Sequence, residues 1–517
     1  MNGARSRQWL ATLARWGHAW PVLGAFVLVV TCDLWWSATV HRLPSWDQAH
    51  HLTQGIDYAR AMRAGGFFHQ FFSVPAVYSP GYHLLLAVAT LVAGPSPALG
   101  LYVNIAVLTL LLVATMQIGT RIGSRRVGCL AAVLLALYPG MVVFGREALI
   151  EFTLAAVTTA SVAALLGCDG FRNRRASVKL GLLFGCGLLV KPSFAFFLWL
   201  PVATVGAAAL RRKDRRALAN LAIASVCGLA LAFPWYWPHW SDVLRLAAVN
   251  RNDALRWGHA RLPWDAFRVY LDSFGDDLMT GIGAIVAGFG LLAGLRHGLR
   301  RLWLVYAWIF GTLLVLVFAL AYRDPKYLLP MLPALAILAA DALARVRPAW
   351  LRVATITVAI GAETVALGPA EFGVELPWLV GTTNQYAGVA GGEPWAIAEI
   401  VAAAQRHGRT AAIGVVPDLP WFNGATLTWQ ARRVGAPLAF FHISDSGRIR
   451  DGHVVDVSQL DLLVLKRGDQ GELRSTDLAA LYSRQVRGDP KTFRLQQTFP
   501  LADGSKAELY TVERPGQ

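Results

Sequence analysis

Long apolar runs recur along the first two thirds of this chain, and they constrain its fold more than any other feature. A helix that crosses a bilayer needs about 20 largely apolar residues. Eleven runs approach or reach that length, and we predict a polytopic α-helical membrane protein with about 11 spans. The runs lie at residues 20–40, 98–118, 127–143, 149–167, 179–190, 193–210, 217–233, 279–295, 302–321, 326–343 and 350–367.

Composition supports this class of protein and excludes a disordered one. Charged residues make up 15% and hydrophobic residues 55% of the 517 positions, whereas soluble domains average about 25% charged residues. The 19 Trp and 24 Phe are too many for a solvated, disordered chain. A net charge of +16 can indicate a protein that binds nucleic acid, but the charged fraction here is low. The position of the basic residues along the chain therefore has to be explained.

The basic residues gather in short segments between the apolar runs. Lys and Arg concentrate in the cytoplasmic loops of membrane proteins, and six segments here hold 21 basic residues but only two acidic ones. These segments are the N-terminus and residues 119–127, 168–179, 211–216, 296–301 and 345–352. All six share one side only if the short apolar stretch 81–93 does not cross, so we predict a non-spanning or re-entrant helix there. The charge is therefore a topology signal, and no nucleic-acid partner is expected.

The same parity predicts which segments are exported. Residues 1–367 form the transmembrane domain, with its N-terminus in the cytoplasm of a cell that carries the protein in its inner or plasma membrane. Its exported loops are 41–80, 144–148, 234–278 and 322–326. Residues 368–517 then form an exported soluble α/β domain.

The pattern of the last 150 residues alternates between strands and helices, which favours a small sheet with helices packed on it. Strands are predicted at Thr410–Val416, Pro437–Ile443 and Asp461–Lys466, and residues 493–499 and 506–512 form a closing hairpin. Helices are predicted at Trp421–Val434 and 476–486.

Two acidic residues at the predicted outer face are candidates for chemistry. Asp47 follows directly on the first span, and Glu151 opens an apolar run shortly after Arg146. A positioned carboxylate beside a cavity of low dielectric constant is suited to act as a general base. The alternatives are a solvated loop acid or a helix N-cap for Asp47, and a plain interfacial ion pair between Arg146 and Glu151.

Polar and aromatic residues near Asp47 are candidates for contact with a substrate. His50 and His51 follow it closely, and since two adjacent histidines rarely share one metal ion, we expect a polar surface and no metal. Tyr78 and Tyr82 flank the start of the non-spanning helix.

Three cations at the outer face are informative because the positive-inside rule disfavours them there. Lys191 lies at a break between two half-length apolar helices, and Arg323 and Lys326 precede Tyr327 at the end of another run. Snorkelling to headgroups is one interpretation of Lys191. Recognition of a specific lipid phosphate fits the three cations better.

The order of these motifs resembles that of the GT-C glycosyltransferases, in the branch of protein O-mannosyltransferases and lipid A aminoarabinose transferases. The resemblance covers roughly residues 15–345. It rests on Trp46-Asp47-Gln48, on Tyr78 to Tyr82, on Arg146 through Glu151, on Gly185 through Lys191, and on Arg323, Lys326, Tyr327 and Pro330. Gln48 stands where the family often has Glu, and Glu151 where it has Asp. A Trp-Trp-Asp-type motif is absent from the C-terminal 150 residues, which argues against an oligosaccharyltransferase.

The resemblance implies a membrane glycosyltransferase that moves a sugar, with inversion, from a polyprenyl-phosphate donor to a glycan, lipid or protein acceptor. Asp47 would deprotonate or orient the acceptor, with Glu151 as a second catalytic acid. Lys191, Arg323, Lys326 and Arg146 would hold the donor phosphate, and His50, His51, Tyr78, Tyr82 and Tyr327 would contact substrate. No cofactor is implied, and a divalent cation is not indicated. Membrane lipids are the other expected partners.

Two other classes of function remain open at this point. A lipid or polysaccharide transporter or flippase would place its site near the midplane on broken helices, whereas the acids found here lie mainly toward the outer face. A non-catalytic assembly protein would use its exported domain to bind a partner.

Overall fold

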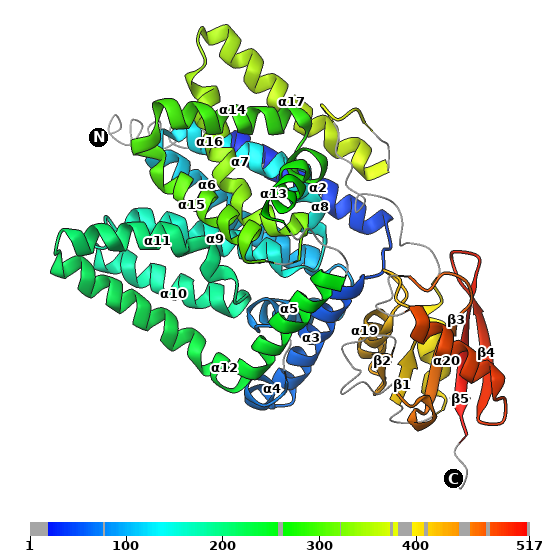
Figure 1. Cartoon of the computed structure of the whole chain (residues 1–517). Helices are drawn as coiled ribbons and strands as arrows, with labels where there is room; N and C mark the ends of the chain where they lie inside the picture. The colour runs from blue at the N-terminus through cyan, green and yellow to red at the C-terminus, as the bar shows by residue number, and fades with distance from the viewer. Residues whose placement is uncertain are drawn as a thin grey trace, which may run out of the picture.

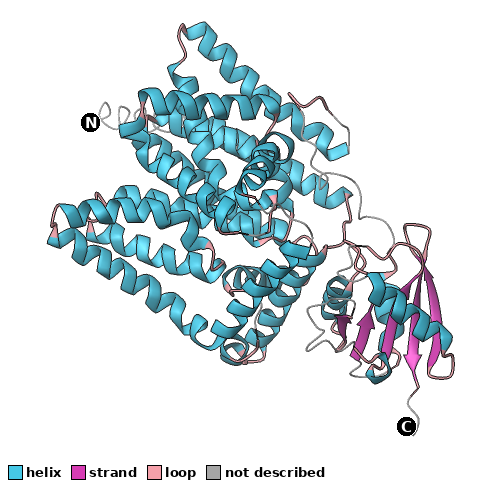
Figure 2. Ribbon diagram, viewed as in Figure 1, coloured by secondary structure: helices cyan, strands magenta, loops and turns pink. Residues whose placement is uncertain are grey.

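The computed structural model describes residues 19–75, 78–256, 262–320, 322–372, 376–380, 395–407, 412–443, 455–471 and 476–513. The basic N-terminal segment, part of the predicted exported loops 41–80 and 234–278, and the start of the strand predicted from Thr410 lie outside these residues. A bundle of helices forms the larger part of the molecule, and a small sheet domain lies at one end of it (Figure 1). Strands occur only in that small domain among the described residues (Figure 2).

Eight helical segments of the described chain are long and apolar enough to cross a membrane, and a ninth is possible if one bent pair counts as a span. This confirms a polytopic α-helical membrane protein. The eight are α2 (Trp20–Thr39), α6 (Leu99–Ile122), α9 (Ile150–Gly167), α11 (Phe194–Arg211), α12 (Arg215–Arg256), α15 (Leu299–Phe318), η2 with α16 (Pro325–Met331 and Leu332–Arg345) and α17 (Ala349–Phe372).

The remaining three predicted spans are the less regular ones. The run at 127–143 forms α7 (Arg125–Leu137) and α8 (Pro139–Arg146), which meet at an angle of 56°. Pro139 explains the break, because proline lacks an amide hydrogen and restricts the residue before it. The runs at 179–190 and 279–295 form α10 (Arg174–Val190) and α14 (Gly281–His297), each with 17 residues.

The helix that contains the predicted span 217–233 extends beyond residue 233. Helix α12 is 42 residues long and passes through Pro234 and Pro238 into what was expected to be an exported loop. At 1.5 Å per residue it is about twice as long as a bilayer core is thick. Trp237 and Trp240 are 73% and 57% exposed on this continuation, as is typical of aromatic residues at a membrane interface. A further helix, α13 (Pro263–Ser273), and a π-helical turn, η1 (Phe274–Leu278), lead into α14.

The first predicted loop is also mostly helical. It contains α3 (Trp46–Arg63) and α4 (Phe67–Phe72), and the short apolar stretch after it forms α5 (Gly81–Ala93). Thirteen residues of α5 are too few to cross a bilayer core, which agrees with the prediction of a non-spanning helix. Helices α3 and α5 pack against each other beside the sheet domain.

The C-terminal domain is a five-stranded mixed sheet in the order β2-β1-β3-β5-β4. Strands β1 (Ala412–Val415), β2 (Ala439–His442) and β3 (Leu462–Lys466) are parallel, whereas β4 (Phe493–Pro500) and β5 (Lys506–Val512) form an antiparallel hairpin. Helices α18 (Ile397–Gln405), α19 (Gly424–Val434) and α20 (Thr476–Gly488) accompany the sheet, with a short turn η5 (Val457–Gln459). The predicted strands and helices are therefore confirmed within the described residues, and α18 was not predicted.

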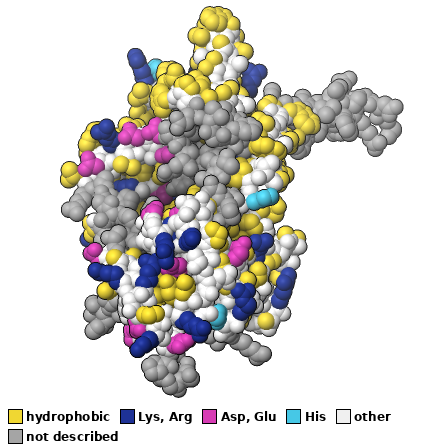
Figure 3. Space-filling model, turned by 90° about the vertical axis from the view of Figure 1, so that its right-hand side faces the viewer, with side chains coloured by type: hydrophobic (Ala, Val, Ile, Leu, Met, Phe, Trp, Pro, Cys, Tyr) yellow, Lys and Arg dark blue, Asp and Glu magenta, His cyan; other side chains and the backbone are white. Residues whose placement is uncertain are grey.

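The surface of the molecule changes in character along its length. Seen from the side that carries the sheet domain, charged side chains of both signs are scattered over the lower part, and hydrophobic side chains gather toward the upper end (Figure 3). In the helical part, large apolar side chains such as Leu292 and Phe318 are 67% and 68% exposed. Apolar surface of this kind suits a lipid environment.

Candidate active site

Asp47 lies in the first turn of α3, where two groups from distant elements contact its carboxylate. Lys326 Nζ from η2 is 3.4 Å from Oδ2, and the Tyr78 hydroxyl donates to Oδ1 at 3.3 Å. Both contacts are long for charged or hydroxyl hydrogen bonds. The side chain is 48% exposed, so a reactant can approach the carboxylate.

The charges around Asp47 determine its protonation. Burial by itself raises the pKa of the Asp47 carboxyl, but Lys326, His50 and Lys191 outweigh it and hold the pKa below its ordinary value. The positive end of the α3 dipole favours the same charge state. Asp47 is therefore ionised and able to accept a proton at neutral pH.

A second ion pair lies next to the first. Lys191 Nζ, at the C-terminal end of α10, is 2.6 Å from Glu151 Oε1 in the first turn of α9. The Tyr327 ring lies beside both lysines, with its centroid 4.8 Å from Lys191 Nζ and 5.9 Å from Lys326 Nζ. Asp47, Glu151, Lys191, Lys326, Tyr78 and Tyr327 thus form one cluster, although they come from different elements of the fold.

Close backbone packing explains why Lys191 comes near the start of α5. A Cβ on Gly81 would lie 2.8 Å from the Leu189 carbonyl oxygen, so only glycine allows this approach. Ser79 hydrogen-bonds the Tyr236 hydroxyl, and that hydroxyl donates to the Leu188 carbonyl. These contacts fix the end of α10, and with it Lys191, against the segment that carries Tyr78.

The histidines form a buried neutral pair behind this cluster. His51 Nδ1 and His83 Nε2 are 3.0 Å apart. Burial lowers the pKa of both imidazoles, that of His83 to about 3, so one ring donates to the other without a charge. The Tyr82 ring lies 5.9 Å from His51 and is fully buried. His50 lies beside Tyr78, with 5.5 Å between ring centroids.

Two predicted phosphate ligands are engaged elsewhere, and the alternative ion pair between Arg146 and Glu151 is wrong. Arg146 Nε instead donates to Asp33 of α2 at 2.8 Å, because Glu151 is taken by Lys191. Arg323 donates to the Leu316 and Val317 carbonyls, the free acceptors at the end of α15. The structure therefore brings Lys191 and Lys326 into the cluster and gives Arg146 and Arg323 other partners.

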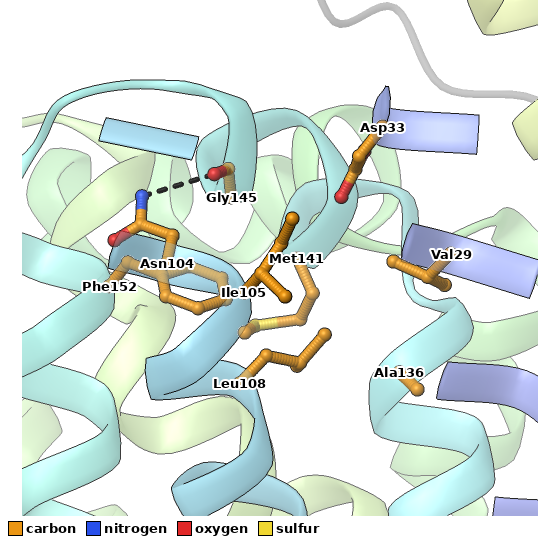
Figure 4. A pocket seen from close by; sticks show the side chains of 9 residues that line it. All are labelled: Val29, Asp33, Asn104, Ile105, Leu108, Ala136, Met141, Gly145 and Phe152. Carbon is orange, nitrogen blue, oxygen red and sulfur yellow. Dashed lines mark hydrogen bonds between the residues drawn. The ribbon is translucent and has the colours of Figure 1, made fainter. Parts of the chain in front are cut away.

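Asn104 of α6 orders the turn between α8 and α9, and nothing in the sequence singled it out. Its amide donates to the carbonyls of Gly145 at 3.0 Å and Glu147 at 2.8 Å. Asn104 and Asp33 line a small cavity among apolar side chains, and the bond to Gly145 is drawn in Figure 4. This bond fixes the chain just before Glu151.

Two further acids near the cluster also escaped prediction. Asp324 Oδ2 lies 3.3 Å from Lys326 Nζ, and the same side chain accepts from the Lys326 amide. Glu147 is 4% exposed and 3.8 Å from Arg42. Burial raises the pKa of Glu147 to about 7, although Arg42 acts in the opposite direction. An Asp-Pro dipeptide before a helical turn was the available signal for Asp324.

Each lysine in the cluster is balanced by carboxylates. Lys326 contacts Asp47 and Asp324, and Lys191 contacts Glu151. An incoming phosphate must therefore compete with a carboxylate for each cation. Among the described residues, His, Cys, Asp and Glu side chains do not gather in a group that could hold a metal ion.

Comparison with known proteins places this geometry in context. Residues 88–240 match the family model of dolichyl-phosphate-mannose-protein mannosyltransferases. The chain has a GT-C glycosyltransferase fold. The first finding agrees with the family resemblance drawn from the motifs, and the second confirms the predicted fold.

Solved structures support this fold along nearly the whole chain. ArnT from Cupriavidus metallidurans, crystallised with undecaprenyl phosphate, has a TM-score of 0.62 at 14% identity and covers 94% of this chain and 97% of its own. The oligosaccharyltransferase of Archaeoglobus fulgidus has a TM-score of 0.57 at 14% identity, over 85% of this chain and 67% of its own. The mycobacterial arabinofuranosyltransferase AftD has a TM-score of 0.57 at 15% identity, over 96% and 40%. No curated protein sequence matches the chain.

Proposed function

We propose that this protein transfers a sugar from a polyprenyl-phosphate donor to an acceptor at the outer face of the inner or plasma membrane, with inversion at the anomeric carbon. The cluster of Asp47, Lys326, Lys191 and Glu151 carries this proposal, because it joins an ionised base to two cations beside the sheet domain. Crystals of a protein with this fold contain undecaprenyl phosphate, and the family model matched by residues 88–240 is named for a dolichyl-phosphate sugar.

The chemistry assigns a role to each side of the cluster. The acceptor hydroxyl gives its proton to Asp47 as its oxygen bonds to the anomeric carbon, from the face opposite the phosphate. The bond between that carbon and the phosphate oxygen breaks, and the lipid phosphate leaves with the electron pair. Lys191 and Lys326 stabilise the charge that develops there, which is usually the largest catalytic contribution. The proposed step uses these side chains alone and assigns no role to a metal ion or other cofactor.

Donor binding also increases the basicity of Asp47 in this mechanism. Lys326 holds Asp47 at 3.4 Å in the free protein and helps to keep the carboxyl pKa low. A phosphate that draws Lys326 toward itself weakens this pair, so the basicity of Asp47 rises when a donor is bound. Glu151 pairs with Lys191 in the same way and holds its ammonium group in place until a phosphate binds.

Tyr78 and Tyr327 lie within the cluster, and with His50 they are proposed to contact the sugar or the acceptor. His51 and Tyr82 are buried behind the cluster and are proposed to support Tyr78. Arg146 and Arg323 remain proposed phosphate ligands only if the donor draws them away from Asp33 and from the α15 carbonyls. The acceptor is a glycan, a lipid or a protein. The N-terminus is proposed to be cytoplasmic and the sheet domain exported.

The test uses the purified full chain in liposomes with radiolabelled dolichyl-phosphate mannose, a panel of undecaprenyl-phosphate sugars, and membrane extract as the acceptor source. We expect label to move from one of these donors to an acceptor, and NMR of the product to show an inverted anomeric centre. Movement of the donor lipid between leaflets without sugar transfer would instead indicate a flippase. Absence of both activities, with undecaprenyl phosphate not bound, would contradict the proposal.

A further inference from the structure

The sheet domain makes direct contacts with α3, the helix that carries Asp47. Trp46 Nε1, in the residue just before Asp47, donates to Asp418 Oδ1 at 2.9 Å. The buried hydroxyl of Thr426 donates to the Pro44 carbonyl at 3.1 Å. These two contacts tie the start of α3 to the loop before α19 and to α19 itself, across more than 370 residues of sequence.

A second group of contacts holds the other end of the same helix. Arg432 of α19 pairs with Asp57 at 3.2 Å, and Arg60 donates to the Arg432 carbonyl. Between the two ends, Trp429 of α19 is fully buried and belongs to the same apolar core as Leu52 and Ile56 of α3. Helix α19 therefore packs along α3 through its length.

The loop that receives Trp46 is itself fixed. The Asp418 amide donates to the Gln470 carbonyl at 2.8 Å. Gly471 next to it has a positive φ of 80°, and a Cβ there would lie 2.2 Å from the Asp418 carbonyl oxygen. Asp418 is thus held by the sheet domain and does not rely on Trp46 for its position.

The side-chain contacts of Asp47, in contrast, are weak positional restraints. Its two partners lie at 3.3 and 3.4 Å. The position of the carboxylate therefore depends mainly on the backbone of the first turn of α3. That turn is where the sheet domain makes its contacts.

We infer that the sheet domain positions Asp47 for catalysis, with Trp46 and Asp418 as the positioning residues. This inference rests on the proposed function, since it assigns the domain a part in the same reaction. Lys191 and Lys326 bind the donor lipid, and this binding does not depend on the contact between Trp46 and Asp418. A displacement of a reacting group by about 1 Å can cost a factor of about 100 in rate, so loss of one of several restraints should lower turnover by about tenfold.

The test compares variants of the full chain in turnover of dolichyl-phosphate mannose, or of the undecaprenyl-phosphate sugar that proves active. Trp46→Phe and Asp418→Ala should each lower kcat about tenfold, with KM for the donor and affinity for undecaprenyl phosphate within about twofold of wild type. Asp418→Asn should restore turnover, because its amide oxygen still accepts from Trp46. The double variant should be no worse than either single one, since both remove the same bond. Trp237→Phe, at an exposed position on α12, is the matched control and should behave as wild type.

Hydrogen exchange supplies a readout that needs no substrate. The Ala49 amide donates to the Ser45 carbonyl in the first turn of α3, and amides of this turn should exchange faster in Asp418→Ala than in Asp418→Asn. The inference is overturned if exchange there is the same in all variants. It is also overturned if Trp46→Phe and Asp418→Ala keep wild-type kcat, or if Asp418→Asn is as slow as Asp418→Ala. Failure of the proposed function is separate, because then wild type transfers no sugar or Asp47→Asn transfers it normally.

Discussion

The carboxylates of Asp47, beside the helical bundle, and Glu508, in the sheet domain, differ in their exposure and in their hydrogen-bond partners. Glu508 is 1% exposed and accepts from Arg467 at 2.5 Å, from Arg487 at 2.9 and 3.1 Å, and from the Tyr510 hydroxyl at 3.1 Å. Asp47 is 48% exposed and has contacts only at 3.3 and 3.4 Å. A saturated carboxylate contributes to stability, whereas one that is loosely held and accessible remains available for a reaction.

The same contrast applies to the cations. Arg467 and Arg487 both pair with Glu508, whose carboxylate also accepts from the Tyr510 hydroxyl. Lys326 is shared by Asp47 and Asp324, so one of its partners can leave while the other still holds it. Shared ion pairs of this kind suit a site in which charge has to be rearranged when a phosphate binds.

The largest effect is expected from Asp47→Asn, which keeps the shape of the side chain and removes its basicity. Transfer should fall at least about 100-fold, as for loss of a general base, while binding of undecaprenyl phosphate and the melting temperature stay near wild type. Radiolabel transfer and thermal unfolding in detergent measure the two quantities. Wild-type transfer by this variant would remove Asp47 from the mechanism.

Glu508→Gln should show the opposite pattern. Loss of the charge that holds two arginines should cost about 2 kcal/mol in the stability of the sheet domain, without a direct effect on donor binding. Unfolding followed by hydrogen exchange of β3 and β5 measures this loss. The contrast between the two carboxylates fails if Glu508→Gln is as stable as wild type.

Lys326→Met should weaken affinity for undecaprenyl phosphate by about tenfold, as expected for loss of one charged hydrogen bond of about 1.5 kcal/mol. Lys326→Arg keeps the charge and serves as the control, so it should retain most of the affinity. Titration of the purified protein with the lipid provides the measurement. Equal affinity of Lys326→Met and wild type would place the phosphate elsewhere.

Glu147→Gln tests the buried acid near the cluster through the pH dependence of stability. The pKa of Glu147 is raised to about 7 in the folded chain, above its unfolded value of about 4.3. Its protonated form therefore stabilises the fold fully below that unfolded value, and this contribution is lost as the pH rises through 7. Wild type should lose stability between pH 5 and 8 while Glu147→Gln loses less. Parallel melting curves of the two proteins would contradict the assignment.

Much of this arrangement could be predicted from the sequence. The apolar runs, the basic segments between them and the short stretch before Gly94 predict the helical bundle and the non-spanning α5. Alternating patterns predict the strands of the C-terminal domain. The outward cations and acids predict the members of the site, because polar groups at those depths are costly unless they have a partner or a function.

The choice of partners could not be predicted. Arg146 and Glu151 are five residues apart and looked like a pair, yet each bonds to a residue on another helix, Asp33 or Lys191. Likewise, α12 continues through Pro234 and Pro238, although proline disfavours the interior of a helix.

The sequence by itself therefore determined the apolar helices of the bundle, the strands of the C-terminal domain and the residues available for chemistry, since these depend on local composition. Only the tertiary structure decided which cation faces which acid, and that the sheet domain holds α3. Those contacts join residues between 40 and more than 370 positions apart, and their geometry follows from packing of the whole chain.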